Sequence, residues 1–440
     1  MLIVRNAEVV WTGTGEELTG VDVVCGDDGR IAPTAGAGEV LDAAGCVVTP
    51  GLVNAHHHLL QTAFRTLPGT RGVPMARWLP TMAAAYTAVG VDDELAAVAA
   101  SAGLAEALLC GVTTVADHHL TWPRGSADAD VAIARATAGA ARELGARLVF
   151  VRGSAGDDPE QAAASADAIA VALVPPGGVT ADGVLQVAVG PAGVHSDGPE
   201  TFALLAEMAT RHGLRRRTQA NEQVDVDVAA ERYGRRPVDL LEEWGWLAPD
   251  VTLAHLCAVT SDEIARLAAA GVTATHAPGC DLPMGWGVAP MAALADAGVA
   301  VGLGTSGGGS NDAGHLLADA RLAMQVAPLA GRPVAAREVL TWATAGSADG
   351  LGRPDLGRLV PGAWADLVCW DVDGVADAGV ADPVAGLLWA RPGRRPRHVV
   401  VGGRVVVRDG ELVAVPEGDV AGRLRTLLTS RERRRHRAAT

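Results

Sequence analysis

Short apolar runs alternate with longer alanine-rich stretches through the middle of the chain. The runs lie at residues 111–117, 147–152, 185–190, 251–255, 272–276 and 299–304, and their length suits buried strands. The stretches between them carry helix signals. Residues 261–270, for example, open with acidic residues and continue with apolar spacing. Strands that alternate with helices in this way predict a parallel sheet.

The middle of the chain has room for about eight such strand–helix units, the number that closes a (β/α)8 barrel. An open doubly wound sheet is less favoured, because no Gly-x-Gly-x-x-Gly follows the first strand. We therefore predict an α/β fold built on a (β/α)8 barrel. The carboxyl ends of its strands would share one rim.

The two ends of the chain show a different pattern, in which short strands are separated by Gly and Asp. These strands are expected within residues 2–10 and 20–50 at one end, and 364–372 and 398–408 at the other. The simplest packing joins both ends into one small β-sandwich beside the barrel. We expect four parts: 1–50, the N-terminal part of the sandwich; 51–345, the barrel; 346–415, the C-terminal part of the sandwich; and 416–440, a C-terminal helix with a basic, solvated tail.

Composition narrows the class of protein. The net charge of −15 over 440 residues argues against binding to nucleic acid. No apolar run approaches the length of a membrane span, and the N-terminus lacks the pattern of a signal peptide, so we expect no membrane contact and a cytoplasmic location. The six cysteines are scattered, which indicates buried free thiols. All 36 basic residues are Arg, which excludes lysine Schiff-base chemistry and favours a single ion if metal is bound.

The most informative polar residues stand where predicted strands end. Residues 49–58 close with His56 and His58, and side chains at positions i and i+2 of a strand project from the same face. Both imidazoles can therefore bind one metal ion. Later strand ends carry further polar residues: Asp117, His118, His119, Gln219, Glu222, His255, His276, Thr305 and Ser306. Six of the twelve histidines stand at such ends, which favours a shared site over ordinary packing.

These motifs resemble the amidohydrolase superfamily, in its branch of heterocycle deaminases and chlorohydrolases. The sequence Pro50-Gly-Leu-Val-Asn-Ala-His-His-His58 is similar to that family's first strand, and segments 113–120, 281–290, 310–312 and 351–357 are similar as well. The resemblance covers nearly the whole chain. It implies a barrel beside a sandwich made from both termini, one divalent metal ion, most often Zn²⁺, a small heterocyclic substrate and a homodimer.

The resemblance also assigns roles to single residues. His56 and His58 match the metal ligands of the first strand. Gln219 stands where the fifth-strand ligand is normally histidine, and Ser306 where the eighth strand normally offers aspartate. An amide and a hydroxyl are weaker donors, so we expect reduced metal affinity. Glu222 matches the glutamate that shuttles a proton.

His255 matches the histidine that orients the attacking water, which makes Glu222 and His255 the expected catalytic residues. Expected substrate contacts are Gln61, Trp78, His118, His119, Trp286 and Asn311. For the polar members of this set, structural hydrogen bonds at the barrel mouth are an equally good explanation.

The predicted function is a metal-dependent hydrolase that attacks a C–N or related bond of a nitrogen heterocycle with metal-activated water. The alternative is a barrel that has lost its metal and acts as a non-hydrolytic enzyme or a small-molecule binder. Gln219 favours this alternative. The joint presence of His56, His58, Glu222 and His255 opposes it.

Overall fold

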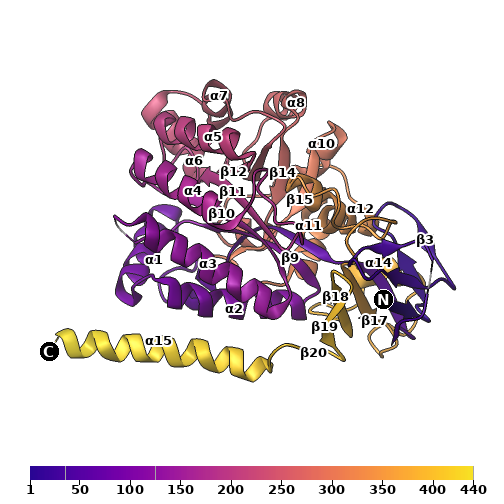
Figure 1. Ribbon diagram of the computed structural model, residues 1–440. Helices are drawn as coiled ribbons and strands as arrows, with labels where there is room; N and C mark the ends of the chain where they lie inside the picture. The colour runs from indigo at the N-terminus through magenta and orange to yellow at the C-terminus, as the bar shows by residue number, and fades with distance from the viewer. Residues whose placement is uncertain (35, 124, 440) are drawn as a thin grey trace.

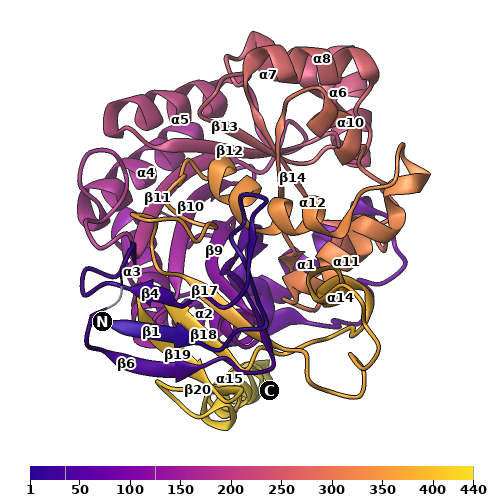
Figure 2. The ribbon, with the colours of Figure 1, turned by 90° about the vertical axis from the view of Figure 1, so that its right-hand side faces the viewer.

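The computed structural model describes residues 1–34, 36–123 and 125–439. Among them, eight parallel strands form the central sheet in chain order (Figure 2): β8 (Leu52–His58), β9 (Val112–His119), β10 (Arg147–Ser154), β11 (Leu185–Pro191), β12 (Arg215–Ala220), β13 (Val251–His255), β14 (Thr273–His276) and β15 (Ala300–Leu303). The last strand resumes as β16 (Ser306–Gly307). Because β15 pairs with β14 and β16 pairs with β8, the sheet closes, and the predicted (β/α)8 barrel is confirmed.

The closure takes place directly beside His56. The backbone N–H of Gly304 donates to the carbonyl of His276 (2.8 Å), and that of Thr305 donates to the carbonyl of His56 (3.0 Å). A Cβ atom on Gly304 would lie 2.7 Å from both Cβ and the carbonyl oxygen of His56, so the close approach of the two strands requires glycine. Barrel closure and the position of His56 therefore depend on one contact.

Helices connect the barrel strands, and most of them cover the outside of the barrel (Figure 1). They are α1 (Met75–Val89), α2 (Asp93–Leu109), α3 (Ala127–Leu144), α4 (Pro159–Leu173), α5 (Pro199–His212), α6 (Gln223–Tyr233), α7 (Pro237–Glu243), α8 (Ser261–Ala270), α9 (Pro278–Asp281), α10 (Met291–Asp296), α11 (Leu316–Val326), α12 (Ala336–Thr341) and α13 (Ser347–Gly350), with short 3₁₀ or π turns η1 (Leu59–Phe64), η2 (Ala327–Leu329) and η3 (Trp342–Gly346). The helix expected at 261–270 is α8. The Thr260 side chain accepts a hydrogen bond from the backbone N–H of Glu263, and the Glu263 carboxylate accepts one from the backbone N–H of Thr260. This capping box sets where α8 begins.

Two sheets at one end of the molecule form the sandwich. The smaller has the order β5–β4–β1–β6 and the larger the order β20–β19–β18–β17–β7–β2–β3. Their strands are β1 (Leu2–Arg5), β2 (Val9–Trp11), β3 (Glu17–Leu18), β4 (Val23–Cys25), β5 (Ile31–Ala32), β6 (Glu39–Asp42), β7 (Cys46–Pro50), β17 (Leu367–Asp371), β18 (His398–Val401), β19 (Arg404–Arg408) and β20 (Glu411–Leu412), and α14 (Pro383–Trp389) lies between β17 and β18. Because β7 pairs with β17, the larger sheet joins both ends of the chain.

A buried ion pair lies where the barrel meets the sandwich. Arg147, at the start of β10, donates from Nε and Nη2 to the two carboxylate oxygens of Asp366 (2.7 and 3.0 Å). Asp366 also accepts from the backbone N–H of Gly402 (2.7 Å), and both charged side chains are 2% exposed. The Arg147 guanidinium lies over the ring of Trp364, 4.4 Å from its centroid. Both oxygens of this carboxylate are therefore satisfied.

The C-terminal segment is the long helix α15 (Glu417–Ala439), which runs along the barrel beneath α2 (Figure 1). The expectation of a solvated tail is wrong for Arg431, whose side chain is only 8% exposed. Its guanidinium donates to the carbonyl of Gly90 and to the carboxylates of Asp92 and Glu94, so this part of the tail packs on the barrel. Among the described residues, no helix is both long and apolar enough to span a bilayer.

Candidate active site

His56 and His58 lie at the carboxyl end of β8 with their rings 4.9 Å apart and nearly perpendicular. The Nδ1 of His58 lies 2.7 Å from the carbonyl of His118, so Nδ1 carries the proton and Nε2 keeps a lone pair. No described residue hydrogen-bonds to the buried Nε2 of His56. Burial lowers the pKa of His58 to about 4 and that of His56 well below its usual value, so both rings are neutral, as metal ligands must be.

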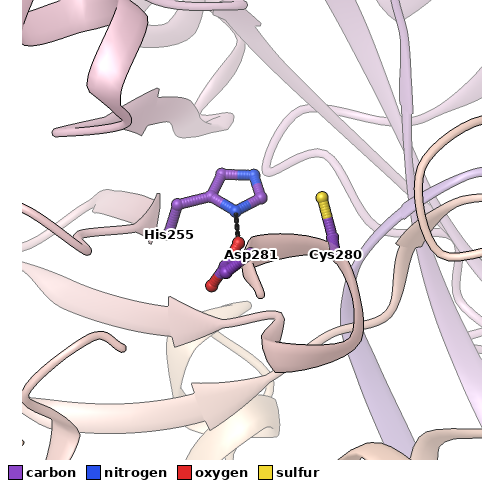
Figure 3. Close-up of side chains that lie close together, drawn as sticks. All are labelled: His255, Cys280 and Asp281. Carbon is purple, nitrogen blue, oxygen red and sulfur yellow. Dashed lines mark hydrogen bonds and ion pairs between the residues drawn. The ribbon is translucent and has the colours of Figure 1, made fainter. Parts of the chain in front are cut away.

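His255 faces the same space from the end of β13, with its ring 5.0 Å from that of His56. Its Nδ1 lies 2.6 Å from Asp281, on α9, and Figure 3 shows this bond with the other ring nitrogen on the far side. Asp281 also binds His276 Nδ1 (3.1 Å). Although burial lowers the pKa of His255, the charge and hydrogen bond of Asp281 outweigh burial and raise it. Asp281 thus fixes the direction of His255.

Cys280 lies beside this pair (Figure 3). Its Sγ, a ring nitrogen of His255 and a carboxylate oxygen of Asp281 lie within 4.8 Å of one another. The nitrogen and oxygen already share a hydrogen bond, and burial raises the pKa of the Cys280 thiol far above its usual value. Cys280 is therefore a neutral thiol in the wall of the site.

Gln219, at the end of β12, presents its side-chain oxygen to His255. Its amide nitrogen donates to the carbonyl of Ala192 (3.0 Å), so the orientation of the side chain is fixed, and Oε1 lies 3.1 Å from His255 Nε2. With Nδ1–H of His255 donated to Asp281, the lone pairs of Nε2 and Oε1 would face each other. A cation must lie between them: a proton on His255 or a metal ion. The donor atoms present therefore fit a metal.

Glu222 is a carboxylate without a hydrogen-bond partner. It lies just before α6, its side chain is fully buried, and neither oxygen bonds to any described residue. Its Oε1 lies 3.5 Å from His255 Nε2. Burial raises the pKa of Glu222 to about 7, against the opposing effect of His255. A carboxyl of this kind exchanges a proton readily near neutral pH.

Backbone strain is concentrated around these residues. Eight described residues other than glycine have positive φ angles, and four of them lie at the strand ends of the site: Asn221 (53°), His255 (75°), Leu256 (55°) and Ser306 (54°). Such angles cost free energy in residues with a Cβ atom and persist where the surrounding structure enforces them. The strain turns the chain sharply after β12 and β13, which aims Glu222 and His255 inward.

A cavity of about 790 Å³ opens above this group. Its polar lining includes His58, Gln61, Gln219 and Ser306, and its walls carry three tryptophans, Trp78, Trp122 and Trp286. The Trp286 ring stands edge-on to His255 at 5.1 Å. The volume and the aromatic walls suit a flat heterocyclic ligand.

Three of the predicted substrate contacts, Gln61, Trp78 and Trp286, line this cavity, but the other three do not. His118 lies behind His58 and hydrogen-bonds to the carbonyl of Gly190 through Nε2 (2.9 Å). His119 hydrogen-bonds to the carbonyl of Thr121 (2.9 Å), and Asn311 donates to the carbonyl of Thr305 (2.8 Å). Asn311 also donates to the carboxylate of Asp319 (2.9 Å), so hydrogen bonds within the protein hold all three side chains.

Three comparisons place the chain among known proteins. A model of the amidohydrolase family matches residues 47–406. The chain belongs to the amidohydrolase family. It is 36% identical over 432 residues to the 8-oxoguanine deaminase of Pseudomonas aeruginosa, which covers 92% of this chain and 94% of the relative. It is 34% identical over 424 residues to the 5-methylthioadenosine/S-adenosylhomocysteine deaminase of Natronomonas pharaonis, covering 95% and 92%.

Solved structures agree with this family. The zinc complex of atrazine chlorohydrolase from Arthrobacter aurescens superimposes with a TM-score of 0.89 at 35% identity, covering 97% of this chain and all of that one. A zinc-bound adenosine deaminase from Xanthomonas campestris shares the fold, with a TM-score of 0.88 at 22% identity. The predicted resemblance and the hydrolase class are therefore confirmed at the level of the amidohydrolase family.

The sequence did not single out two charged groups of this amidohydrolase site. Asp281 lies 26 residues after its partner His255, and no spacing rule joins a strand end to a short helix in the next connection. The other group is His195 with Asp225, which lie within 4.8 Å of Glu222. His195 lies in the connection to α5, five residues after the predicted strand at 185–190 ends, and only the folded chain brings it to the cavity.

Proposed function

We propose that this amidohydrolase is a metal-dependent deaminase of an amino-substituted bicyclic heterocycle of the purine or pterin type. The observation that carries the proposal is Glu222, a buried carboxyl with no hydrogen-bond partner beside a group of metal-binding donors. The names of similar proteins support the substrate class, since they include deaminases of 8-oxoguanine and isoxanthopterin. The cavity of about 790 Å³ has room for two fused rings.

We assign the metal to His56, His58, Gln219 and His255, with Ser306 at the edge of the set. The His56 ring lies 4.9 Å from that of His58 and 5.0 Å from that of His255, and Gln219 Oε1 lies 3.1 Å from His255 Nε2. When bound, a zinc ion supplies the Lewis acidity that activates water. His255 has a fixed direction because Asp281 holds its other nitrogen. This assignment adds His255 to the ligands expected from the sequence. The His255 imidazole would take the place of the fifth-strand histidine, whose position Gln219 occupies.

The protein's own groups then position the ring and move the proton. The tryptophan walls hold the heterocycle flat over the donors, which places the carbon that bears the amino group near Glu222. Glu222 accepts one proton from the attacking water and passes it to the ring nitrogen. The hydroxyl proton of the adduct then passes through Glu222 to the amino group, so that ammonia leaves and a carbonyl remains. The absence of other hydrogen bonds to Glu222 leaves both oxygens available for this transfer.

The test is ammonia release by the zinc-loaded enzyme from 8-oxoguanine, isoxanthopterin and 5-methylthioadenosine, with atrazine as a probe of chloride release. We expect ammonia from at least one of the first two. The metal-depleted binder would be favoured instead by two results together. The protein would release neither ammonia nor chloride after incubation with zinc, and its zinc content would stay well below one equivalent.

We also propose a homodimer, as the family resemblance implies, and a cytoplasmic location, as expected from the sequence. Light scattering of the purified protein tests the homodimer: a mass of one chain, 44.8 kDa, over a wide concentration range would contradict it.

A further inference from the structure

His195 lines the cavity but has no part in the reaction described above. It lies between β11 and α5, and its side chain is 6% exposed. Its Nδ1 lies 2.6 Å from Asp225 Oδ1, and its backbone N–H points at the same oxygen (3.3 Å). No described residue hydrogen-bonds to its other ring nitrogen, Nε2. The ring is therefore held from one side and free on the other.

The pair is built into the wall with little room to move. Asp225 lies in the first turn of α6, its side chain is fully buried, and His195 is the only described residue that hydrogen-bonds to its carboxylate. A Cβ atom on Gly193 would lie 2.7 Å from both Asp225 Oδ1 and His195 Nδ1, so only glycine leaves space for this contact. The ring cannot turn away without leaving a buried carboxylate unpaired.

Charge fixes what the free nitrogen can do. A buried carboxylate with a single partner requires a positive charge on that partner. Burial lowers the pKa of His195, but the charge and hydrogen bond of Asp225 outweigh burial and raise it to about 9. The imidazolium donates from both nitrogens and accepts at neither. Nε2–H is thus a donor at the cavity wall throughout the neutral range.

We infer that His195, positioned by Asp225, determines specificity by donating a hydrogen bond to a carbonyl oxygen of the heterocycle. The inference rests on the proposed function. Because His195 and Asp225 lie within 4.8 Å of Glu222, the carbonyl must stand close to the reacting amidine, on the same ring or on the ring fused to it. Substrates would then be oxopurines or oxopterins, and analogues without the oxygen would leave a charged donor unpaired and bind weakly.

Calorimetry on the zinc-loaded protein tests this with ligands that are not consumed. The probes are purine, 2-hydroxypurine, xanthine and urate, which carry none, one, two and three carbonyl oxygens. In the wild type we expect the affinity to rise by about tenfold or more when the oxygen that His195 binds is added, as a charge-assisted hydrogen bond provides. In His195→Phe that rise should disappear while binding of purine changes little.

Two further variants separate the donor from the scaffold. Asp225→Asn keeps the His195 ring but removes the negative charge that favours its protonated form. The rise in affinity on adding the carbonyl oxygen should therefore become smaller. His212→Phe is the matched control, because His212 also bonds to a carboxylate, Asp167 (2.8 Å), but lies away from the cavity. It should leave the series unchanged.

Equal loss of affinity for all four ligands in His195→Phe, purine included, or no loss for any, would overturn the inference. The proposed function fails independently, through absent ammonia release by the wild type. If the protein shows no deaminase activity but its affinity still rises with the added carbonyl oxygen in a way that depends on His195, the hydrogen bond from His195 stands and the proposed deamination is rejected.

Discussion

Two buried carboxylates at opposite ends of the barrel show how differently one fold treats the same chemical group. Asp366, between barrel and sandwich, receives two hydrogen bonds from Arg147 and one from the backbone. Glu222, at the other end, is buried as deeply and receives none. A satisfied buried charge holds parts together, whereas an unsatisfied one is costly and is kept for a reaction. Asp225 lies between these cases, with one partner whose charge depends on pH.

Removing the reactive carboxylate should have the largest effect. We expect Glu222→Gln to lower the rate of ammonia release by about 10²–10⁴-fold, the contribution typical of a general acid–base group. Zinc content and the thermal midpoint should stay near wild type, because no hydrogen bond to the protein is lost. Retained turnover would show that another group carries the proton.

Removing the structural carboxylate, Asp366, should lower the stability of the fold and leave the reaction rate nearly unchanged. Asp366→Ala leaves the buried Arg147 guanidinium without a carboxylate to balance its charge, which we expect to cost about 3–5 kcal/mol of unfolding free energy. Denaturant unfolding measures the loss, and kcat of the folded fraction should change little. Asp296→Ala is the matched control, since its partner Arg332 lies at the surface. Similar losses in both variants would mean that burial of the Arg147 pair is unimportant.

The pair of His195 and Asp225 predicts a pH dependence of the stability of the fold. The folded pKa of His195, about 9, lies above the ordinary value of 6.5. The stabilisation from its pairing with Asp225 is therefore complete below pH 6.5 and is lost as the pH rises through about 9, with a maximum of about 3 kcal/mol. The acidic groups that face it, Asp225, Glu222 and Asp197, all act in this direction. The difference in thermal midpoint between wild type and His195→Phe should narrow over this range, and a constant difference would contradict the charge assigned to His195.

The smallest expected effect concerns the donor that replaces the usual histidine. Gln219→His should raise zinc affinity by about tenfold, or about 1.4 kcal/mol, because imidazole is a better donor than an amide. Competition with a chromophoric chelator measures it. Gln161→His, on the exposed face of α4, serves as the control. Unchanged affinity would place Gln219 outside the metal's ligands.

Sequence patterns predicted the barrel and much of the candidate site, because apolar runs define buried strands and polar residues at their ends meet on one rim. They failed for β12, whose sequence Arg-Arg-Arg-Thr-Gln-Ala is too polar for a buried strand. The fold accommodates it because Arg216 pairs with Asp250 (2.6 Å), while Arg217 donates across the barrel to the carbonyl of Ala55. Gln219 was located only through the family resemblance.

Charged partners outside the barrel strands were beyond sequence reasoning. Asp281, on the short helix α9, binds His255 and His276, and His195, in the connection before α5, binds Asp225; these contacts form only when the chain has folded, and neither residue belongs to a periodic pattern. The polar residues at the rim also look alike in sequence. His118 and His58 both follow apolar strands, yet one hydrogen-bonds to a backbone carbonyl behind the site and the other lines the cavity.

The pairing of β7 with β17 bears on the order in which the molecule is made. Val47 on β7 pairs with Trp370 on β17, across more than three hundred residues, and β7 runs directly into the strand that carries His56. During synthesis β7 therefore has no partner on that side until the ribosome has passed residue 371. The sheet whose strand β7 leads into the strand with His56 is thus completed late, and a chain that stops before β17 leaves that edge of β7 unpaired.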